Sequence, residues 1–254
     1  MIPPLLLVVI LAKIVGVALW FFTAQRMAAV LLFIGPDPFL LYAILVPSAQ
    51  GLVRVFTRFA TDRREIWLTI DDGPDPDDTP KILDLLDRHG AQATFFVIGE
   101  RAARWPELVL EIVRRGHEIG HHTHTHPVAS FWCASPRRLA RELDRALTIL
   151  RELGVRPRWF RAPVGIKHPL LARALGSRDL RCVGWTIRSG DCHSRSPDAM
   201  AASVAGRLHP GAVVLLHEGP SVPARARVTG LALLLAAATE RGFSCVLPPA
   251  DQLR

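Results

Sequence analysis

Two adjacent carboxylates, Asp71 and Asp72, end an apolar run and stand directly before a Gly73-Pro74 pair. Adjacent side chains of a strand point to opposite faces, so a turn is needed to bring both carboxylates into one pocket. A carboxylate pair placed in this way could take up a proton and bind a cation. Because Asp and Gly-Pro are also ordinary turn formers, an acidic turn without chemistry is the alternative for this segment.

Five histidines lie within ten residues of a second segment: His117, His121, His122, His124 and His126. We expect His122 and His126, which are four residues apart, to share one face of a helical turn and to bind one divalent cation. A carboxylate from Asp72 would complete the set and leave coordination positions for water and substrate. For some of the other histidines, an ordinary structural role is the alternative.

Two more segments, each closing a strand-like run, add an arginine and a histidine. They are Phe160-Arg161-Ala162-Pro163-Val164-Gly165 and Val214-Leu215-Leu216-His217-Glu218-Gly219. Together the four segments suffice for amide hydrolysis, in which a metal polarises the carbonyl and activates water while a carboxylate takes the proton. A histidine would protonate the leaving amine, and a backbone N–H near the oxyanion would complete the site.

The elements that must position these residues alternate from Glu65 onward. Short β-rich runs read as strands at 66–70, 93–98, 159–161, 181–185, 212–217 and 243–247. Helical spacing of apolar residues, often with proline in the first turn, occurs at 80–88, 106–115, 136–153, 169–175, 197–208 and 224–241, with Ser135 as an N-cap. This alternation predicts an α/β domain with a parallel sheet, open or closed, and the residues named above fall at the carboxyl ends of its strands.

The first 60 residues are predicted to be a hydrophobic membrane anchor, with residues 61–254 forming the catalytic domain. Residues 3–22 are almost wholly apolar and long enough for one span, despite Lys13. A second span at 27–46 is the alternative, since Gly35-Pro36-Asp37-Pro38 interrupts it. A cleaved signal peptide is a further alternative. The expected location is the inner membrane of a bacterium. Arginines after the second run favour the cytoplasmic side for the catalytic domain, and the outer side is the alternative.

The formal charge of +8 favours an anionic neighbourhood such as lipid headgroups or an acidic glycan, and a solvated basic face is the alternative. No zinc-finger, RRM or KH pattern accompanies the charge, so nucleic acid is not an expected partner. The four cysteines are far apart and form no CxxC pair, so they predict neither a zinc knuckle nor a disulfide framework. The HExxH pattern of metallopeptidases is also absent from the sequence.

Five ordered motifs between Glu65 and the C-terminus resemble those of polysaccharide deacetylases of the NodB-homology type, carbohydrate esterase family 4. They read TIDDGPD, HTHTHP, FRAPVG, a fourth segment that contains Trp185, and LLHEG. The resemblance implies a distorted (β/α) barrel with a divalent ion, zinc before cobalt or nickel, in a groove open to sugar chains.

The resemblance also assigns a role to eight residues of this sequence. The resemblance implies that Asp71 is the catalytic base, that His217 is the catalytic acid, and that Asp72, His122 and His126 are the metal ligands. It also implies that Arg161 orients Asp71 and that Asp191 stabilises the charged form of His217. The backbone N–H of Val164 would bind the oxyanion.

Two departures from the family pattern concern the substrate more than the reaction. Arg188 stands where many members have aspartate, and Glu218 follows His217 where aspartate is commoner. The sequence therefore predicts metal-dependent removal of N-acetyl or other N-acyl groups from an amino-sugar polysaccharide. Two alternatives stay open: a deacylase or deformylase of a lipid-linked amino sugar, and a membrane-anchored glycan-binding module without catalysis.

Overall fold

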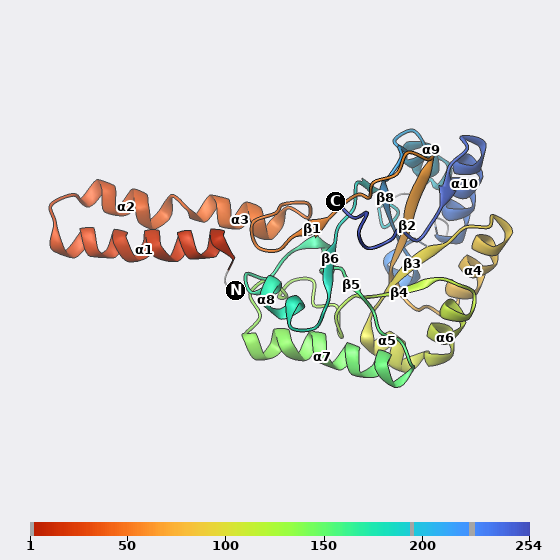
Figure 1. Ribbon diagram of the computed structural model, residues 1–254, viewed down its shortest axis with the longest axis horizontal. Helices are drawn as coiled ribbons and strands as arrows, with labels where there is room; N and C mark the ends of the chain where they lie inside the picture. The colour runs from red at the N-terminus through yellow and green to blue at the C-terminus, as the bar shows by residue number, and fades with distance from the viewer. Residues whose placement is uncertain (1–2, 194–195, 224–226) are drawn as a thin grey trace.

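The computed structural model describes residues 3–193, 196–223 and 227–254. In Figure 1, a hairpin of helices projects from one side of an α/β domain, and the chain then enters a curled sheet flanked by helices. The start of α1 and the C-terminus lie near the junction between the hairpin and the domain.

Nine strands and ten α-helices occur in the described residues. The strands are β1 (Val55–Phe56), β2 (Glu65–Gly73), β3 (Ala93–Val97), β4 (Glu118–His121), β5 (Trp159–Phe160), β6 (Arg181–Val183), β7 (Ile187–Arg188), β8 (Val213–His217) and β9 (Ser244–Cys245). The helices are α1 (Pro4–Phe22), α2 (Arg26–Ile34), α3 (Asp37–Leu45), α4 (Thr79–Arg88), α5 (Gly99–Arg104), α6 (Pro106–Arg114), α7 (Pro136–Glu152), α8 (Leu171–Gly176), α9 (Pro197–Ala205) and α10 (Arg227–Glu240), with short 3₁₀ turns η1 (Pro163–Gly165) and η2 (Gly219–Ser221).

All strands of the sheet pair in parallel, in the order β1-β6-β5-β4-β3-β2-β8-β7, with β9 pairing the start of β2. The edge strands β1 and β7 do not pair with each other in the described residues, so the sheet curls without closing. This is the expected distorted barrel in open form. Strand β1 belongs to the sheet although it precedes residue 60, where the domain boundary was expected.

The sheet separates two apolar layers. On its outer side, the helices α4, α6, α9 and α10 cover a core that includes Leu68, Phe95 and Val214. On its inner side, Trp67 packs edge-on against Trp159, with ring centroids 5.6 Å apart. Successive residues of a strand therefore point into different layers, because side chains of a strand alternate between its two faces.

Several short elements were not predicted. Strand β4 lies in the histidine segment, where only a helical turn was expected, and β1, β7 and helix α5 were also missed. Strands of two to four residues carry little periodic signal, so some of them, such as β5, β6 and β9, were predicted and others were not. The expected helix at 224–241 is present as α10, although residues 224–226 lie outside the described residues. Ser135 does cap α7, where its hydroxyl accepts a bond from the Arg138 N–H.

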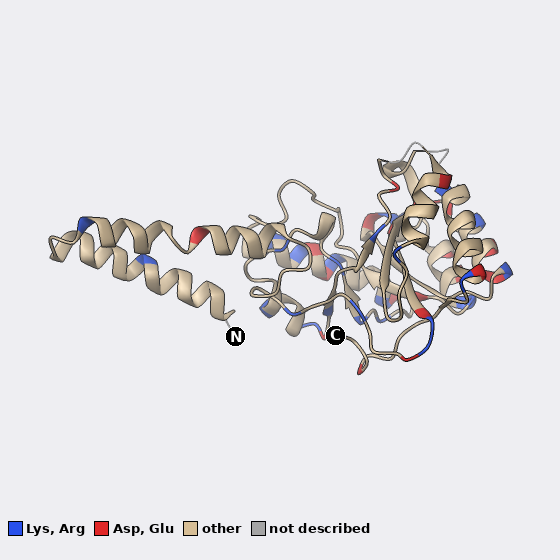
Figure 2. Ribbon diagram, turned by 90° about the horizontal axis from the view of Figure 1, so that it is seen from above, with Lys and Arg blue, Asp and Glu red and all other residues tan. Residues whose placement is uncertain are grey.

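The N-terminal helices form an antiparallel pair, α1 against α2 and α3. Two segments, Pro4–Phe22 and Arg26–Leu45, are long and apolar enough to cross a membrane, and a signal sequence would pass the same test. The chain is interrupted at Gly35 and Pro36, between α2 and α3, as the prolines predicted. Figure 2 shows few charged residues on the hairpin and many on the domain.

Candidate active site

A bulge at the end of β2 turns both carboxylates toward the inner side of the sheet. Along β2, Trp67, Thr69 and Asp71 share the inner face, so an undistorted strand would direct Asp72 outward. The pairing register with β3 shifts between Asp71 and Gly73, and Asp72 has a φ of 72°. This left-handed residue supplies the turn that the sequence required to bring both carboxylates to one pocket.

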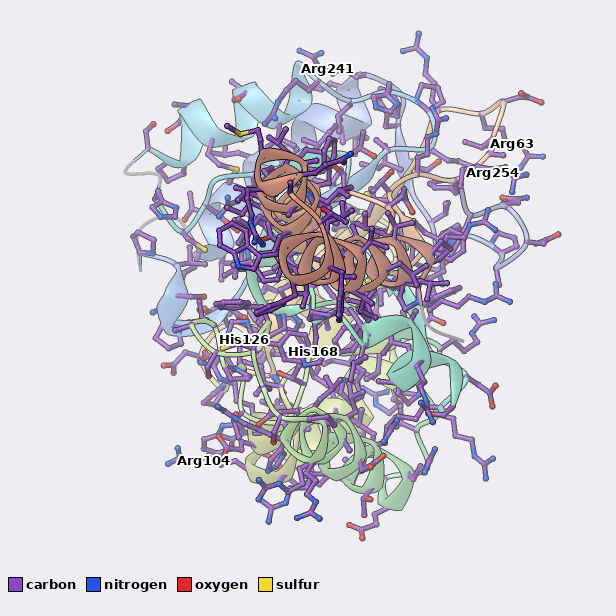
Figure 3. The ribbon with its side chains drawn as sticks, turned by 90° about the vertical axis from the view of Figure 1, so that its left-hand side faces the viewer. Arg63, Arg104, His126, His168, Arg241 and Arg254 are labelled. Atoms are coloured by element: carbon purple, nitrogen blue, oxygen red, sulfur yellow. The ribbon has the colours of Figure 1, made fainter. Side chains whose placement is uncertain are left out.

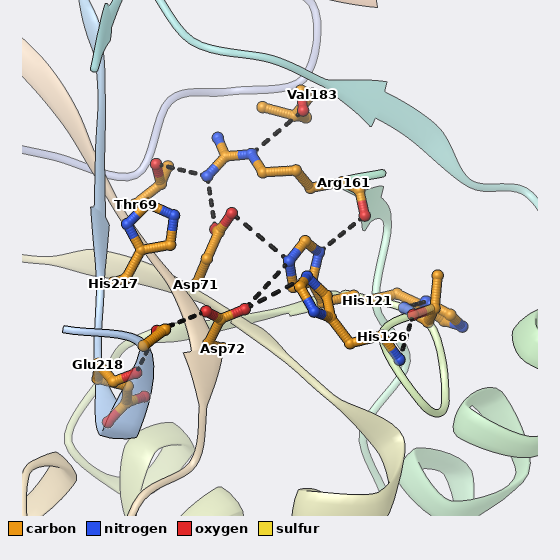
Figure 4. Close-up of polar contacts among 12 residues, drawn as sticks. Thr69, Asp71, Asp72, His121, His126, Arg161, Val183, His217 and Glu218 are labelled. Atoms are coloured by element: carbon orange, nitrogen blue, oxygen red, sulfur yellow. Dashed lines mark hydrogen bonds and ion pairs between the residues drawn. The ribbon is translucent and has the colours of Figure 1, made fainter. Parts of the chain in front are cut away.

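Asp72, His122 and His126 come together as a possible metal site (Figure 4). Oδ1 of Asp72 lies 3.5 Å from Nε2 of His122 and 3.4 Å from Nε2 of His126. Ligands about 2.0 to 2.1 Å from a tetrahedral zinc ion are roughly 3.3 Å from one another, so the spacing of these donors fits such an ion.

The prediction of a helical turn between His122 and His126 is wrong. His122 follows β4 directly, and the chain then loops, with φ of 64° at Thr123 and 53° at His126. Glu142 of α7 holds this loop by accepting bonds from the backbone N–H groups of His124 and Thr125 and from the Thr125 hydroxyl. The two imidazoles meet because a distant helix fixes the loop, and not because of a helical period.

The protonation of the three side chains suits a cation. Oδ1 of Asp72 is buried and has no hydrogen-bond partner among the described residues. Burial disfavours the charged form of Asp72, but His122, His126 and His217 together hold its pKa below the usual value. Burial lowers the pKa of His126 to about 4, so its imidazole is neutral near pH 7. Nδ1 of His122 lies 2.8 Å from the Arg161 carbonyl, and donation to this oxygen leaves Nε2 free for a metal.

Arg161 holds Asp71 by one oxygen. The buried guanidinium donates from Nη1 to Oδ1 of Asp71 at 2.7 Å and to the hydroxyl of Thr69 at 2.8 Å. Its Nη2 donates to the carbonyl of Gly184 at 2.8 Å. Oδ2 of Asp71 is turned toward the possible metal site, 3.7 Å from Nε2 of His122. One oxygen is thus anchored while the other faces the pocket.

His217, at the end of β8, pairs with Asp191 from the loop after β7. Nδ1 of His217 lies 2.8 Å from Oδ1 of Asp191, and the His217 N–H donates to Oδ2 at 2.7 Å. Burial works against the charged imidazole, but the hydrogen bond to Asp191, with Cys192 and the charge of Asp71 adding to it, raises the pKa of His217 to about 11. The ring is therefore an imidazolium near neutral pH.

A cavity of about 330 Å³ joins these groups, and Val164 lies on its wall. Val164 adopts a φ of 48°, which is unusual for a β-branched residue, and its side chain is exposed. Its N–H makes no hydrogen bond to another described residue. Six of the eight predicted residues thus line one cavity, and the other two, Arg161 and Asp191, contact Asp71 and His217 from behind it.

Three supporting side chains were missed by the sequence reading. The Ser221 hydroxyl donates to Oδ2 of Asp72 at 2.8 Å, and Arg101 donates to the Asp72 carbonyl at 2.5 Å. Thr69 joins Asp71 through Arg161, as described above. Ser221 and Arg101 carry no local signal because they come from different elements, whereas Thr69 was visible as the residue two positions before Asp71 on the same strand face.

The two departures from the family pattern occupy different places. Glu218 is fully buried beneath the bulge, where its Oε2 accepts a bond from the Thr79 hydroxyl. Burial raises the pKa of Glu218 to about 8. Arg188 instead lines the cavity and is exposed, so it can meet a substrate.

Comparison with known proteins gives the family. The family model described as polysaccharide deacetylase matches residues 59–183. A chitooligosaccharide deacetylase of Bradyrhizobium sp. (strain ANU 289) is 36% identical over 202 residues, which are 75% of this chain and 90% of that protein.

Solved structures agree with this match. A peptidoglycan N-acetylglucosamine deacetylase, crystallised with an N-hydroxy benzamide, has a TM-score of 0.69 and 32% identity over 75% of this chain and 88% of its own. A family 4 carbohydrate esterase from Streptomyces lividans, in complex with acetate, has a TM-score of 0.67 and 27% identity over 76% and 97%. Sequence, motif order and fold agree, and this chain belongs to the polysaccharide deacetylase family, a hydrolase family that acts on N-acetyl amide bonds.

Proposed function

We propose that this protein hydrolyses the N-acetyl group of an amino sugar within a glycan, with a divalent metal held by Asp72, His122 and His126. The convergence of a metal-ligand set, an anchored carboxylate and an imidazolium on one cavity carries the proposal. Relatives named for chitooligosaccharide and peptidoglycan deacetylation support this substrate class.

When bound, the metal would supply a Lewis acid for the amide carbonyl and would make water more acidic. Two histidine nitrogens and one carboxylate oxygen are the donors that zinc accepts, with cobalt and nickel also compatible with such a set. Zinc, before cobalt or nickel, is the ion that we propose for this site.

Asp71 is placed to act as the base. Its Oδ1 is held by Arg161, so Oδ2 faces the possible metal ligands and can take a proton from a water in the cavity. The water oxygen adds to the amide carbon, and the N–H of Val164 is available to the oxyanion.

His217 is placed to act as the acid. Its Nδ1 is bound to Asp191, which leaves the protonated Nε2 to give a proton to the leaving nitrogen as the C–N bond breaks. The products are a carboxylate and the free amine. The pairing with Asp191 keeps the imidazole charged until that step.

A glycan-binding module without catalysis is the alternative, and the presence of the possible metal ligands, Asp71 and His217 in one cavity supports the enzyme instead. The discriminating experiment measures acetate released from chitotetraose and from peptidoglycan fragments by the full chain, purified in detergent and loaded with zinc, cobalt or nickel. Asp71→Asn should lower kcat by at least about 100-fold because the base is lost. The bound metal should remain stoichiometric.

Asp62→Asn is the matched control, since this aspartate is exposed at the opposite end of β2. It should retain full activity. Turnover by Asp71→Asn at the wild-type rate would refute the assigned base, and sugar binding with no acetate release by the wild type would favour the binding module.

A further inference from the structure

The hairpin formed by α1, α2 and α3 has an apolar outer surface. Twenty of the 25 exposed large hydrophobic side chains in the described residues lie between Leu7 and Leu45. At 1.5 Å per residue, the 19 residues of α1 extend about 29 Å, close to the thickness of a bilayer core. A surface of this length and composition is suited to lipid rather than water.

The two arms of the hairpin are matched to each other. A Cβ on Gly16 would lie 2.9 Å from the Ala29 carbonyl oxygen, so the glycine permits close approach of the helices. The Lys13 ammonium lies 2.8 Å from a carboxylate oxygen of Asp37 on the other arm. Pairing neutralises two charges that would each be costly inside a bilayer. These contacts favour two spans over one.

The base of the hairpin packs against the wall of the active site. The Lys167 N–H donates to the carbonyl of Ile44 at 2.9 Å, and its buried ammonium donates to the carbonyl of Val46 at 2.5 Å. A Cβ on Gly165 would lie 2.6 Å from Pro47, which follows α3, and 2.7 Å from Trp185, which lines the cavity. The end of the hairpin and the cavity wall therefore meet at one glycine.

The surface beside the cavity is itself apolar. Of the five exposed large hydrophobic side chains outside the hairpin in the described part of the chain, Val128 and Val164 line the cavity, and Trp132 lies in the loop that contains Val128. In Figure 3, which looks along the hairpin toward the domain, His126 lies beside the outline of the hairpin. Because the end of the hairpin meets the cavity wall at Gly165, a bilayer around the hairpin would end close to the cavity.

Arg188 supplies a positive charge at the cavity. It lines the cavity, and its guanidinium has no hydrogen-bond or ion-pair partner among the described residues. Such a guanidinium fits the oxygens of a phosphate better than an uncharged sugar.

We propose that the hairpin crosses the bilayer twice and holds the cavity at the bilayer surface, where the enzyme deacylates an amino sugar linked to a membrane lipid through a phosphate. The proposal rests on the proposed function and names its substrate. The sugar enters from the membrane side past Val128 and Val164, and Arg188 binds the phosphate. The reaction is the same hydrolysis, in which water cleaves the C–N bond.

The test uses the full chain, loaded with zinc and reconstituted in phospholipid vesicles. Three substrates are compared at equal total concentration: N-acetylglucosamine pyrophosphate on a polyprenol in the same vesicles, the same sugar pyrophosphate on a short water-soluble alkyl chain, and chitotetraose. The rate of acetate release should be at least about 100-fold higher for the polyprenol-linked sugar, since confinement to one surface raises its effective concentration. Diluting the vesicles into excess detergent should reduce this advantage.

Arg188→Gln should lower the ratio of the polyprenol-linked rate to the chitotetraose rate by about tenfold, which is the size of one charge-assisted contact. Arg63→Gln is the matched control, because Arg63 is exposed near the opposite end of the domain, and its ratio should be unchanged. An unchanged ratio for Arg188→Gln would refute the phosphate contact.

The outcomes separate this inference from the proposed function. Acetate from chitotetraose at a rate equal to or above that from the polyprenol-linked sugar would overturn the inference and leave the proposed function standing. Equal rates for the short-chain and polyprenol-linked sugars would show phosphate recognition without the membrane, which also overturns it. No acetate from any substrate would overturn both.

Discussion

Asp191→Asn should discharge His217 near neutral pH with little change in the size of its partner. Asparagine has the shape of aspartate, and its single amide oxygen can still accept the bond from Nδ1 of His217, which is 2.8 Å from Oδ1. Its NH2 group, however, cannot accept the bond that the His217 N–H donates to Oδ2. Asparagine also lacks the negative charge that opposes the burial penalty of the imidazolium. The pKa of His217 should therefore fall from about 11 to 6.5 or below.

The size of the effect follows from this difference. A change from about 11 to 6.5 corresponds to about 6 kcal/mol of preference for the charged ring. At pH 8 a group with a pKa of 6.5 is only about 3% protonated. Because the proposed acid must carry its proton, kcat/KM at pH 8 should fall at least about 30-fold, and the loss should be much smaller at pH 6.

The assay is the pH dependence of kcat/KM for acetate release from chitotetraose, with metal content measured in each variant. The pH above which kcat/KM falls because His217 loses its proton should move from above pH 10 in the wild type to about pH 6.5 in Asp191→Asn. NMR titration of the labelled His217 imidazole reports the same shift without turnover. Asp144→Asn, which removes a surface carboxylate paired with Arg178, should change neither measurement. An unchanged pKa of His217 in Asp191→Asn would refute the reasoning.

Three further predictions concern the metal, a buried carboxyl and the hairpin. Asp72→Ala should weaken zinc binding at least about 100-fold, as measured by equilibrium dialysis, because it removes one of three donors; unaltered affinity would place the metal elsewhere. Glu218 keeps its proton in the folded protein up to about pH 8, whereas the unfolded chain loses it near 4.5. The free energy of unfolding should therefore fall by up to about 1.4 kcal/mol per pH unit through that window, and chemical denaturation of Glu218→Gln should lack this slope; the same slope in both proteins would contradict the burial argument. With two spans, a cysteine at Gln25 and the exposed Cys133 should react with an impermeant maleimide from opposite sides of oriented membrane vesicles; labelling from the same side would exclude the hairpin topology.

Much of the site could be predicted from the sequence because its residues stand in short motifs at strand ends. Asp71 and Asp72 required a turn to share a pocket, and the bulge at Asp72 provides it. The strands that carry these motifs, β2 and β8, are continuous apolar runs because both of their faces are buried, and such runs can be recognised in the sequence. In contrast, β4 is short and contains Gly120, which packs against the ring of Phe96 and gives no β signal of its own.

The amino-acid sequence by itself determined the residue types, their order along the chain, the apolar N-terminus and the alternation that leads to a parallel sheet. Only the tertiary structure decided which groups meet: the guanidinium of Arg161 and its carboxylate Asp71, 90 positions apart, or Glu142 and the histidine loop. The pairing of Lys13 with Asp37, which turns two apolar segments into a hairpin, was likewise beyond the sequence pattern. The reason is physical, since local patterns reflect backbone periodicity and burial, whereas contacts between distant segments depend on how the whole chain packs.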